Sequence, residues 1–156
     1  LALAVQDPNR DWEALVIGRD GKKTKEARLR APAPAEAEGY LADLLDIHAR
    51  GMREPLPLPP VTTAKWAEEV HKLDGEAPPS RLAEITSRVA GQWETSSAWE
   101  NEDRDPYQLL AWGKQLNFEE LLSMTPTAQE SWNSQPSRLG QYAIRMWEPL
   151  LNHEGI

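Results

Sequence analysis

The residues best suited to binding a charged partner lie in one short basic stretch. Residues 19–30 carry six Lys or Arg and two Asp or Glu, whereas the whole chain has a net charge of −8. Lys and Arg neutralise nucleic-acid phosphates, so we expect any DNA contact to come from this stretch. The predicted DNA-binding residues are Arg19, Lys22, Lys23, Lys25, Arg28 and Arg30. A structural alternative stays open, because lysines at a sheet edge also discourage pairing with other chains.

A second group of residues imitates the metal site of a two-metal nuclease. Such sites combine one carboxylate with a second carboxylate and a lysine two residues apart on a strand, so that metal and attacking water share one face. Asp7 or Asp11 is available as the first carboxylate, and Glu26-Ala27-Arg28 is the nearest imitation of the second pair. Arg28 cannot release a proton as a lysine can. We therefore predict no catalytic residue, and keep an active Mg²⁺-dependent nuclease as the alternative.

Other recognisable sites are missing from the sequence. It has no phosphate-binding glycine loop, no nucleophile elbow and no cysteine. His48, His71 and His153 are too far apart for the spacing of metal ligands. We expect no metal and no cofactor. The lack of cysteine fits a reducing compartment, and no apolar run approaches a membrane span, so we expect a cytoplasmic location without membrane association.

The basic stretch must be positioned by strands. Residues 12–17 predict a strand, and its continuous apolar end at 14–17 is typical of a position buried on both faces. Asp20-Gly21 predicts a hairpin turn, followed by a return strand over about 23–30 whose mixed faces indicate an edge strand. Leu1 to Val5 is expected to be the end of another strand.

After the strands, apolar periodicity predicts helices. His48 lies on the apolar face of the first of them, where we expect a packed core histidine, and Gly51 is the expected left-handed residue that ends it. Thr62 or Thr63 is the expected cap of the next. Residues 95–104, with Glu100, are expected to be a solvated loop. The predicted helices span 36–50, 63–74, 80–96, 106–113 and 137–151, with a short helical anchor at Phe118 to Leu122.

The segment from Gly51 to Pro60 separates the strands from most of the helices. Four of its last six residues are proline, which holds it extended near polyproline II. We interpret it as a rigid internal strap with Leu56 and Leu58 as its apolar anchors. The alternative is a docking ligand for an aromatic groove.

The 156 residues suit one α+β domain, with strands and the basic hairpin at 1–30 and mostly helices at 36–151. The chain begins at Leu1 inside an apolar run, which we interpret as a fragment of a longer protein.

Three strings in chain order resemble one family. They are residues 51–58 (GMREPLPL) followed by 62–66, residues 105–113 (DPYQLLAWG), and residues 137–143 (SRLGQYA) with 147–151 and Glu154. The strand expected at 12–19 also matches. Together they resemble the C-terminal domain of the exodeoxyribonuclease V gamma chain, the RecC subunit of the bacterial RecBCD helicase–nuclease. The resemblance covers nearly the whole chain, and is poorest at 114–136.

This resemblance implies a degenerate restriction-endonuclease-like fold of the PD-(D/E)XK type that has lost its catalytic residues. It implies a non-catalytic domain of a subunit acting in double-strand-break repair and recombination. In the family, that subunit scaffolds helicase and nuclease partners, RecB-like and RecD-like, and helps to split the duplex. ATP binding and nuclease chemistry belong to those partners, and the helicase-like parts that recognise Chi lie outside this chain.

Overall fold

The computed structural model describes residues 1–73, 79–94 and 101–155. The chain divides into two compact units, Leu1–Arg50 with Pro149–Ile156, and Gly51–Glu148. The boundary falls at Gly51, where the strap begins. The expected single domain over residues 1–156 stays a prediction, and each unit is described by itself.

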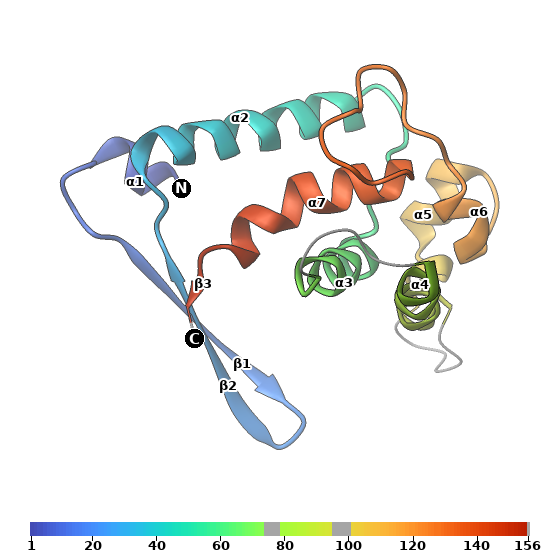
Figure 1. The fold of residues 1–156 in the computed structure, drawn as a ribbon, viewed down its shortest axis with the longest axis horizontal. Helices are drawn as coiled ribbons and strands as arrows, with labels where there is room; N and C mark the ends of the chain where they lie inside the picture. Colours follow the sequence, from blue (N-terminus) through green and yellow to red (C-terminus); the bar gives the residue numbers. More distant parts are fainter. Residues whose placement is uncertain (74–78, 95–100, 156) are drawn as a thin grey trace. The chain divides into compact units, whose positions relative to one another are not determined.

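The first unit contains a small antiparallel sheet (Figure 1), formed by β1 (Glu13–Asp20), β2 (Lys23–Arg30) and β3 (Glu154–Gly155). The strand order is β1-β2-β3, and the hairpin register pairs Asp20 with Lys23 and Glu13 with Arg30. Gly21 has φ 61°, which suits the first position of a two-residue hairpin loop. The predicted hairpin is therefore confirmed, whereas the short β3 was not expected from the sequence.

Two expectations about these strands are wrong. The return strand β2 is central and β1 is the edge. Leu15, Val16 and Ile17 of β1 are 53%, 53% and 62% exposed, not buried on both faces. An apolar run indicates which side chains favour burial, but it does not say whether a neighbouring strand is present to bury them. The expected strand at the start of the chain is instead the helix α1 (Ala2–Gln6).

The helix α2 (Pro34–Gly51) confirms the helix predicted at 36–50. Its buried residues are Ala37 and Ile47, whereas His48 is exposed, so the expected core histidine is wrong. Ile47 is its neighbour on the helix, and the apolar side chain takes the buried position. Gly51 is helical and has no positive φ, so the expected left-handed end at this residue is also wrong.

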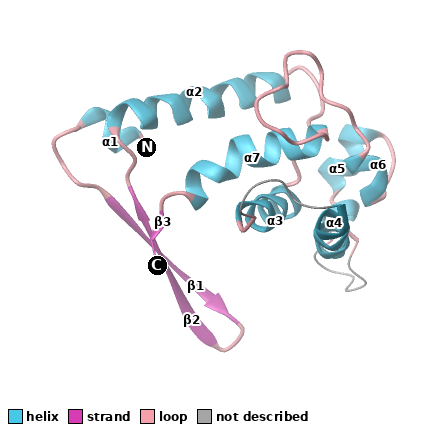
Figure 2. Ribbon diagram, in the orientation of Figure 1, coloured by secondary structure: helices cyan, strands magenta, loops and turns pink. Residues whose placement is uncertain are grey.

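Helices make up the second unit (Figure 2). The four helices predicted after residue 60 are confirmed with ends shifted by a few residues, and the short anchor at 118–122 is confirmed as a helix. The predicted ends at 74 and 95–96 lie outside the described residues. The elements are α3 (Pro60–His71), α4 (Pro79–Trp93), the 3₁₀ turn η1 (Glu102–Arg104), α5 (Pro106–Trp112), α6 (Phe118–Leu122) and α7 (Arg138–Leu151).

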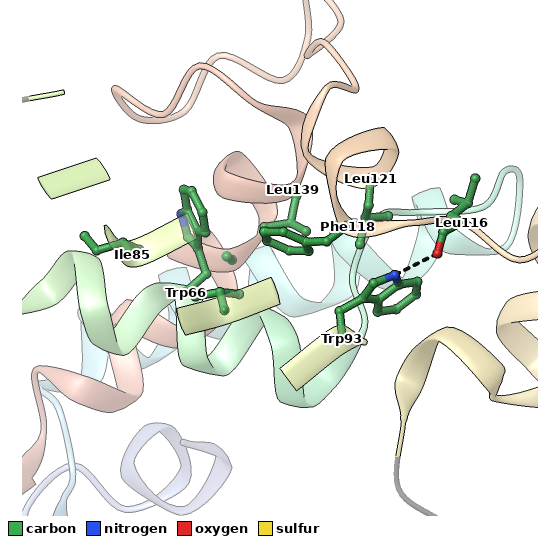
Figure 3. Close-up of a cluster of buried hydrophobic side chains, with 9 residues drawn as sticks. Trp66, Ile85, Trp93, Leu116, Phe118, Leu121 and Leu139 are labelled. Atoms are coloured by element: carbon green, nitrogen blue, oxygen red, sulfur yellow. Dashed lines mark hydrogen bonds between the residues drawn. The ribbon is translucent and has the colours of Figure 1, made fainter. Parts of the chain in front are cut away.

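An apolar core lies among these helices (Figure 3). Ile85, Val89 and Trp93 of α4 are fully buried, and the helical spacing of apolar residues favours such a stripe, whereas Leu82 on the same stripe is half-buried. The indole Nε1 of Trp93 donates to the carbonyl of Leu116 at 2.8 Å, which satisfies its polar atom. The other members of this core are Trp66, Leu116, Phe118, Leu121, Leu139 and Ala143.

Candidate interaction surface

The register of the hairpin sorts its side chains into two faces, because paired residues of an antiparallel ladder point to the same side. One face, called here face A, carries Glu13, Leu15, Ile17 and Arg19 of β1 with Thr24, Glu26, Arg28 and Arg30 of β2. The opposite face, called here face B, carries Ala14, Val16 and Gly18 of β1 with Lys23, Lys25, Ala27 and Leu29 of β2. Each face therefore combines apolar and charged side chains.

The predicted DNA-binding residues are all exposed, but they do not form one patch. Arg19, Arg28 and Arg30 lie on face A, and Lys23 and Lys25 lie on face B, while Lys22 is in the loop. The Arg19 Nε donates to the carbonyl of Gly21 at 2.5 Å, which holds this guanidinium at the turn. A flat partner would meet only one of these sets, whereas a partner surrounding the tip would meet both.

The carboxylates considered for metal binding are distributed differently. Glu26 is exposed on face A opposite Ile17, while Asp7 and Asp11 lie in the connection between α1 and β1. Across the described residues, no three His, Cys, Asp or Glu side chains gather as metal ligands. An active nuclease centre stays a prediction of the alternative hypothesis.

The strap is anchored differently from the sequence expectation. Leu56 and Leu58 are half-buried, whereas Pro57 and Pro59 are fully buried. The Leu58 N–H donates to the Leu56 carbonyl at 2.8 Å, so the segment contains a tight turn and is not continuous polyproline II. A Cβ on Gly51 would lie 3.6 Å from Leu56 Cδ1, an ordinary contact.

A buried ion pair, not expected from the sequence, lies beside the strap. Glu130 is fully buried and accepts from Arg138 Nε at 2.9 and 2.8 Å and from Arg138 Nη2 at 2.7 Å. The Tyr142 hydroxyl donates to it at 2.6 Å, and the Thr127 N–H at 2.9 Å. Arg138 Nη2 also donates to Glu54 of the strap at 2.6 Å. This network connects the strap to α7.

The pKa values in this network move in opposite directions. Burial raises the pKa of Glu130, but hydrogen bonds from Arg138, Thr127 and Tyr142 outweigh it and lower the pKa to about 2. Burial and the hydrogen bond to Glu130 raise the pKa of Tyr142 to about 12. The pair is therefore ionised near neutral pH, with Tyr142 as a neutral donor. Both carboxylate oxygens of Glu130 already accept hydrogen bonds from neighbouring groups, so we interpret the ion pair as structural and not as a ligand site.

A second carboxylate, Glu102, binds the start of α3. Pro59 and Pro60 have no N–H groups, so Val61 and Thr62 carry the first free donors of the helix. They donate to the two oxygens of Glu102 at 2.8 and 2.7 Å. The expected cap by Thr62 or Thr63 is therefore wrong.

Residues 101–104 are also not a solvated loop, since η1 includes them in part and Asp103 is buried. Asp103 accepts from Gln115 Nε2 at 2.6 Å. Glu100 and the rest of the expected loop at 95–100 lie outside the described residues.

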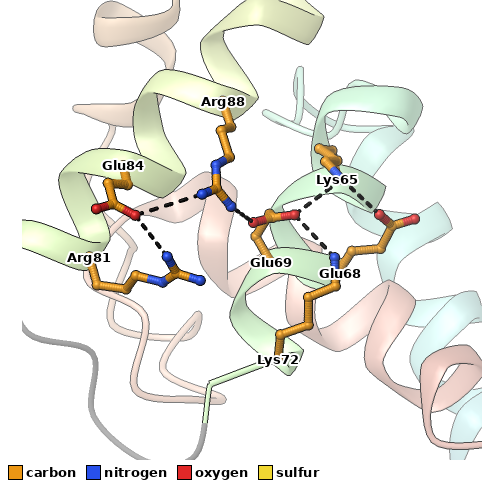
Figure 4. Close-up of polar contacts among 7 residues, drawn as sticks. All are labelled: Lys65, Glu68, Glu69, Lys72, Arg81, Glu84 and Arg88. Atoms are coloured by element: carbon orange, nitrogen blue, oxygen red, sulfur yellow. Dashed lines mark hydrogen bonds and ion pairs between the residues drawn. The ribbon is translucent and has the colours of Figure 1, made fainter.

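A third carboxylate connects α3 to α4 (Figure 4). Glu69 is 6% exposed and contacts Lys65 and Lys72 at 3.1 Å and Arg88 at 2.9 Å. Burial raises its pKa, but these three cations outweigh that effect and lower the pKa to about 2. Glu130, Glu102 and Glu69 were missed because charged residues in loops or on predicted polar faces give no periodic signal of burial.

Comparisons with known proteins agree with the resemblance seen in the sequence. Residues 1–71 match the family described as the RecC C-terminal domain. The chain is 36% identical over 155 residues to the RecBCD enzyme subunit RecC of Mycobacterium tuberculosis. It is 36% identical over 154 residues to that of Mycolicibacterium smegmatis.

Each alignment covers 99% of this chain, which spans about 13% of the length of these relatives. No solved structure matches the chain. None of the helices in the described part is long and apolar enough to cross a membrane.

Proposed function

We propose that this chain carries a RecC C-terminal domain and that it is a non-catalytic structural and interaction domain of a RecBCD-type helicase–nuclease. The proposed complex acts in the cytoplasm in double-strand-break repair and recombination. The observation that supports this role is similarity to RecC subunits along 99% of the chain. The proposed partners are the helicase and nuclease subunits of the same complex, RecB-like and RecD-like, and the DNA that the complex holds.

The proposal includes a degenerate PD-(D/E)XK-type fold without catalysis. Its support is the family resemblance together with Arg28, which stands where the nuclease pattern needs a lysine. The alternative, an active Mg²⁺-dependent nuclease, predicts chelator-sensitive DNA cleavage that is lost in Glu26→Ala. Cleavage of that kind would overturn the non-catalytic role, and no cleavage would remove the alternative.

Assembly tests the interaction role directly. The full subunit that contains this chain is mixed with its helicase and nuclease subunits, with and without the region 1–156, and analysed by size-exclusion chromatography. We expect the complete subunit to form the three-subunit complex and the shortened subunit to lose at least one partner. Unchanged assembly without this region would contradict the interaction role.

DNA binding tests the hairpin. Charge reversal of Lys22, Lys23 and Lys25 to Glu is expected to weaken binding and to reduce the salt dependence, since each lost phosphate contact lowers the slope of log K against log salt by about 0.9. The matched control replaces the same three residues by Arg, which keeps the charge. Fluorescence anisotropy over a salt series measures both variants in the assembled complex. Equal binding and slope for the Glu and Arg variants would remove the hairpin from the DNA interface.

A further inference from the structure

The outer edge of β1 is open in the part of the chain that the structure describes. The sheet order β1-β2-β3 places β2 between its two neighbours, so β1 has a partner on one side only. Two hydrogen bonds show which residues of β1 direct their backbone groups toward β2. The Ala31 N–H donates to the Trp12 carbonyl at 2.9 Å, and the Arg30 N–H donates to the His153 carbonyl at 3.0 Å.

Along an antiparallel strand, the N–H and C=O groups of successive residues point alternately to the two sides of the strand. The Trp12 carbonyl points toward β2, and therefore the N–H and C=O groups of the even-numbered residues of β1 do so as well. The N–H and C=O groups of Glu13, Leu15, Ile17 and Arg19 are directed away from β2, toward the open edge. These four residues present the unpaired half of a hydrogen-bonding ladder.

The side chains along this edge are also unsuited to solvent. Leu15 and Ile17 on face A and Val16 on face B are each more than half exposed. Proteins usually protect a free edge with Pro, an inward charge or a lysine in the strand. β1 has neither Pro nor Lys between Glu13 and Asp20. Beyond the pairing of β3 with Arg28 and Leu29, the hairpin is a two-stranded ribbon, which is marginally stable without a further strand.

We propose that a further strand, supplied by the same subunit polypeptide outside residues 1–156, pairs with the open edge of β1. This inference rests on the proposed function, because the RecC relatives provide that additional chain: the present chain spans 13% of their length. On the other side of β2, a distant segment of this chain, β3, already pairs with Arg28 and Leu29. A segment on the same polypeptide also has a high effective concentration at the edge.

The side chains of β1 define the chemistry of this strand. Residues opposite Leu15 and Ile17 are apolar, which extends the apolar strip on face A. An acidic residue lies opposite Arg19 and a basic residue opposite Glu13, because like charges directly opposite each other destabilise a pair. Backbone hydrogen bonds supply the attraction, and this order of side chains supplies the register.

Residue-resolved hydrogen exchange on the full subunit, without its partners, tests the proposal. The outward amides of Leu15, Ile17 and Arg19 are compared with the inward amides of Val16 and Gly18. We expect both sets to exchange on the order of 100-fold more slowly than free peptide. Outward amides exchanging at the free-peptide rate beside protected inward amides would overturn the proposal.

Two further outcomes assign the edge to another occupant and also overturn it. Protection that rises with protein concentration would assign it to a second copy, and protection that requires the helicase and nuclease subunits would assign it to a partner. A subunit that assembles normally while its outward amides exchange freely would refute this inference and leave the proposed function intact.

A pair of variants adds a second readout. Replacing Leu15 and Ile17 together by Thr keeps β propensity but removes the apolar strip, so we expect the outward amides to lose at least about 10-fold in protection. The control is Val61→Thr, which changes a similarly exposed apolar residue, 54% exposed, in α3. It should leave the exchange of β1 unchanged. Equal protection in both variants would count against apolar contacts at this edge.

Discussion

Glu130 has a structural role that follows from its surroundings. It is fully buried, and its carboxylate takes hydrogen bonds from Arg138, Tyr142 and the Thr127 backbone. Removing one member of a buried ion pair leaves the other charge desolvated and unpaired, which is more costly than the pair itself is stabilising. Loss of the Glu130 charge is therefore expected to lower the stability of the fold.

Glu130→Gln keeps the shape of the side chain but leaves Arg138 without its buried counter-charge. We expect the free energy of unfolding to fall by about 3–5 kcal/mol, measured by urea denaturation. The matched control is Glu54→Gln, which removes only the half-exposed ion pair between Glu54 and the same arginine. This variant should cost less than about 1 kcal/mol. A Glu130→Gln variant no less stable than the control would refute the buried pair.

At Gly140, α7 lies so close to the Gln135 side chain that there is no room for a larger residue. A Cβ at this position would lie 2.8 Å from Gln135 Cβ, so one of the two segments would have to shift. We expect Gly140→Ala to lower stability by about 1–3 kcal/mol. Gly91→Ala in α4 is the control, because nothing lies within 4 Å of its added methyl. It should be neutral or stabilising by up to about 1 kcal/mol. Thermal melting of both variants compares them, and equal melting temperatures would contradict the close approach.

Among the secondary-structure elements, α3 depends on a carboxylate about forty residues away in sequence. Two consecutive prolines precede its first free N–H groups, and Glu102 accepts from Val61 and Thr62. A negative charge at this end also interacts favourably with the helix dipole. The strap, α3 and η1 are therefore coupled through a single side chain.

Glu102→Ala is expected to lower the free energy of unfolding by about 1–2 kcal/mol, because two helix N–H groups lose their acceptor. Chemical denaturation measures the change. The control is Glu119→Ala, an exposed acid in the first turn of α6 that caps no other helix among the described residues. If the two variants lost the same stability, a general charge effect would explain the result and the cap would not.

For the whole molecule, two buried carboxylates with a strongly lowered pKa predict sensitivity to acid. Both Glu69 and Glu130 have a pKa of about 2 in the folded chain, below their ordinary value of 4.5. Their stabilisation is present above pH 4.5 and is lost as the pH falls from there toward 2, where the folded state binds its protons. Each contributes at most about 3 kcal/mol.

Urea denaturation at several pH values checks this expectation. Stability should fall between pH 4.5 and 2, and Glu130→Gln should show a smaller fall because one of the two groups no longer titrates. A pH dependence identical in the variant and the parent chain would show that Glu130 is not responsible for the acid sensitivity.

Much of the local structure could be predicted from the sequence. The hairpin at Asp20-Gly21 follows from turn chemistry, and the stripe Ile85, Val89 and Trp93 follows from helical periodicity. The cap of α5 is another local feature, since Asp105 accepts from the Tyr107 and Gln108 N–H groups directly before the helix-starting Pro106. These features depend on residues within a few positions of one another.

The sequence by itself also carried the resemblance to the RecC C-terminal domain, because ordered strings along the chain show it independently of any contact, and residues 1–71 match that family. Only the tertiary structure decided that Glu130 is buried, that Glu102 caps α3, and that β1 is the edge strand. Each of these depends on which distant segment lies beside the residue, and local periodicity contains no such information. The basic residues of the hairpin illustrate both kinds of information, that of the sequence and that of the tertiary structure. Their charge is readable from the sequence, whereas their division between face A and face B follows from the strand register.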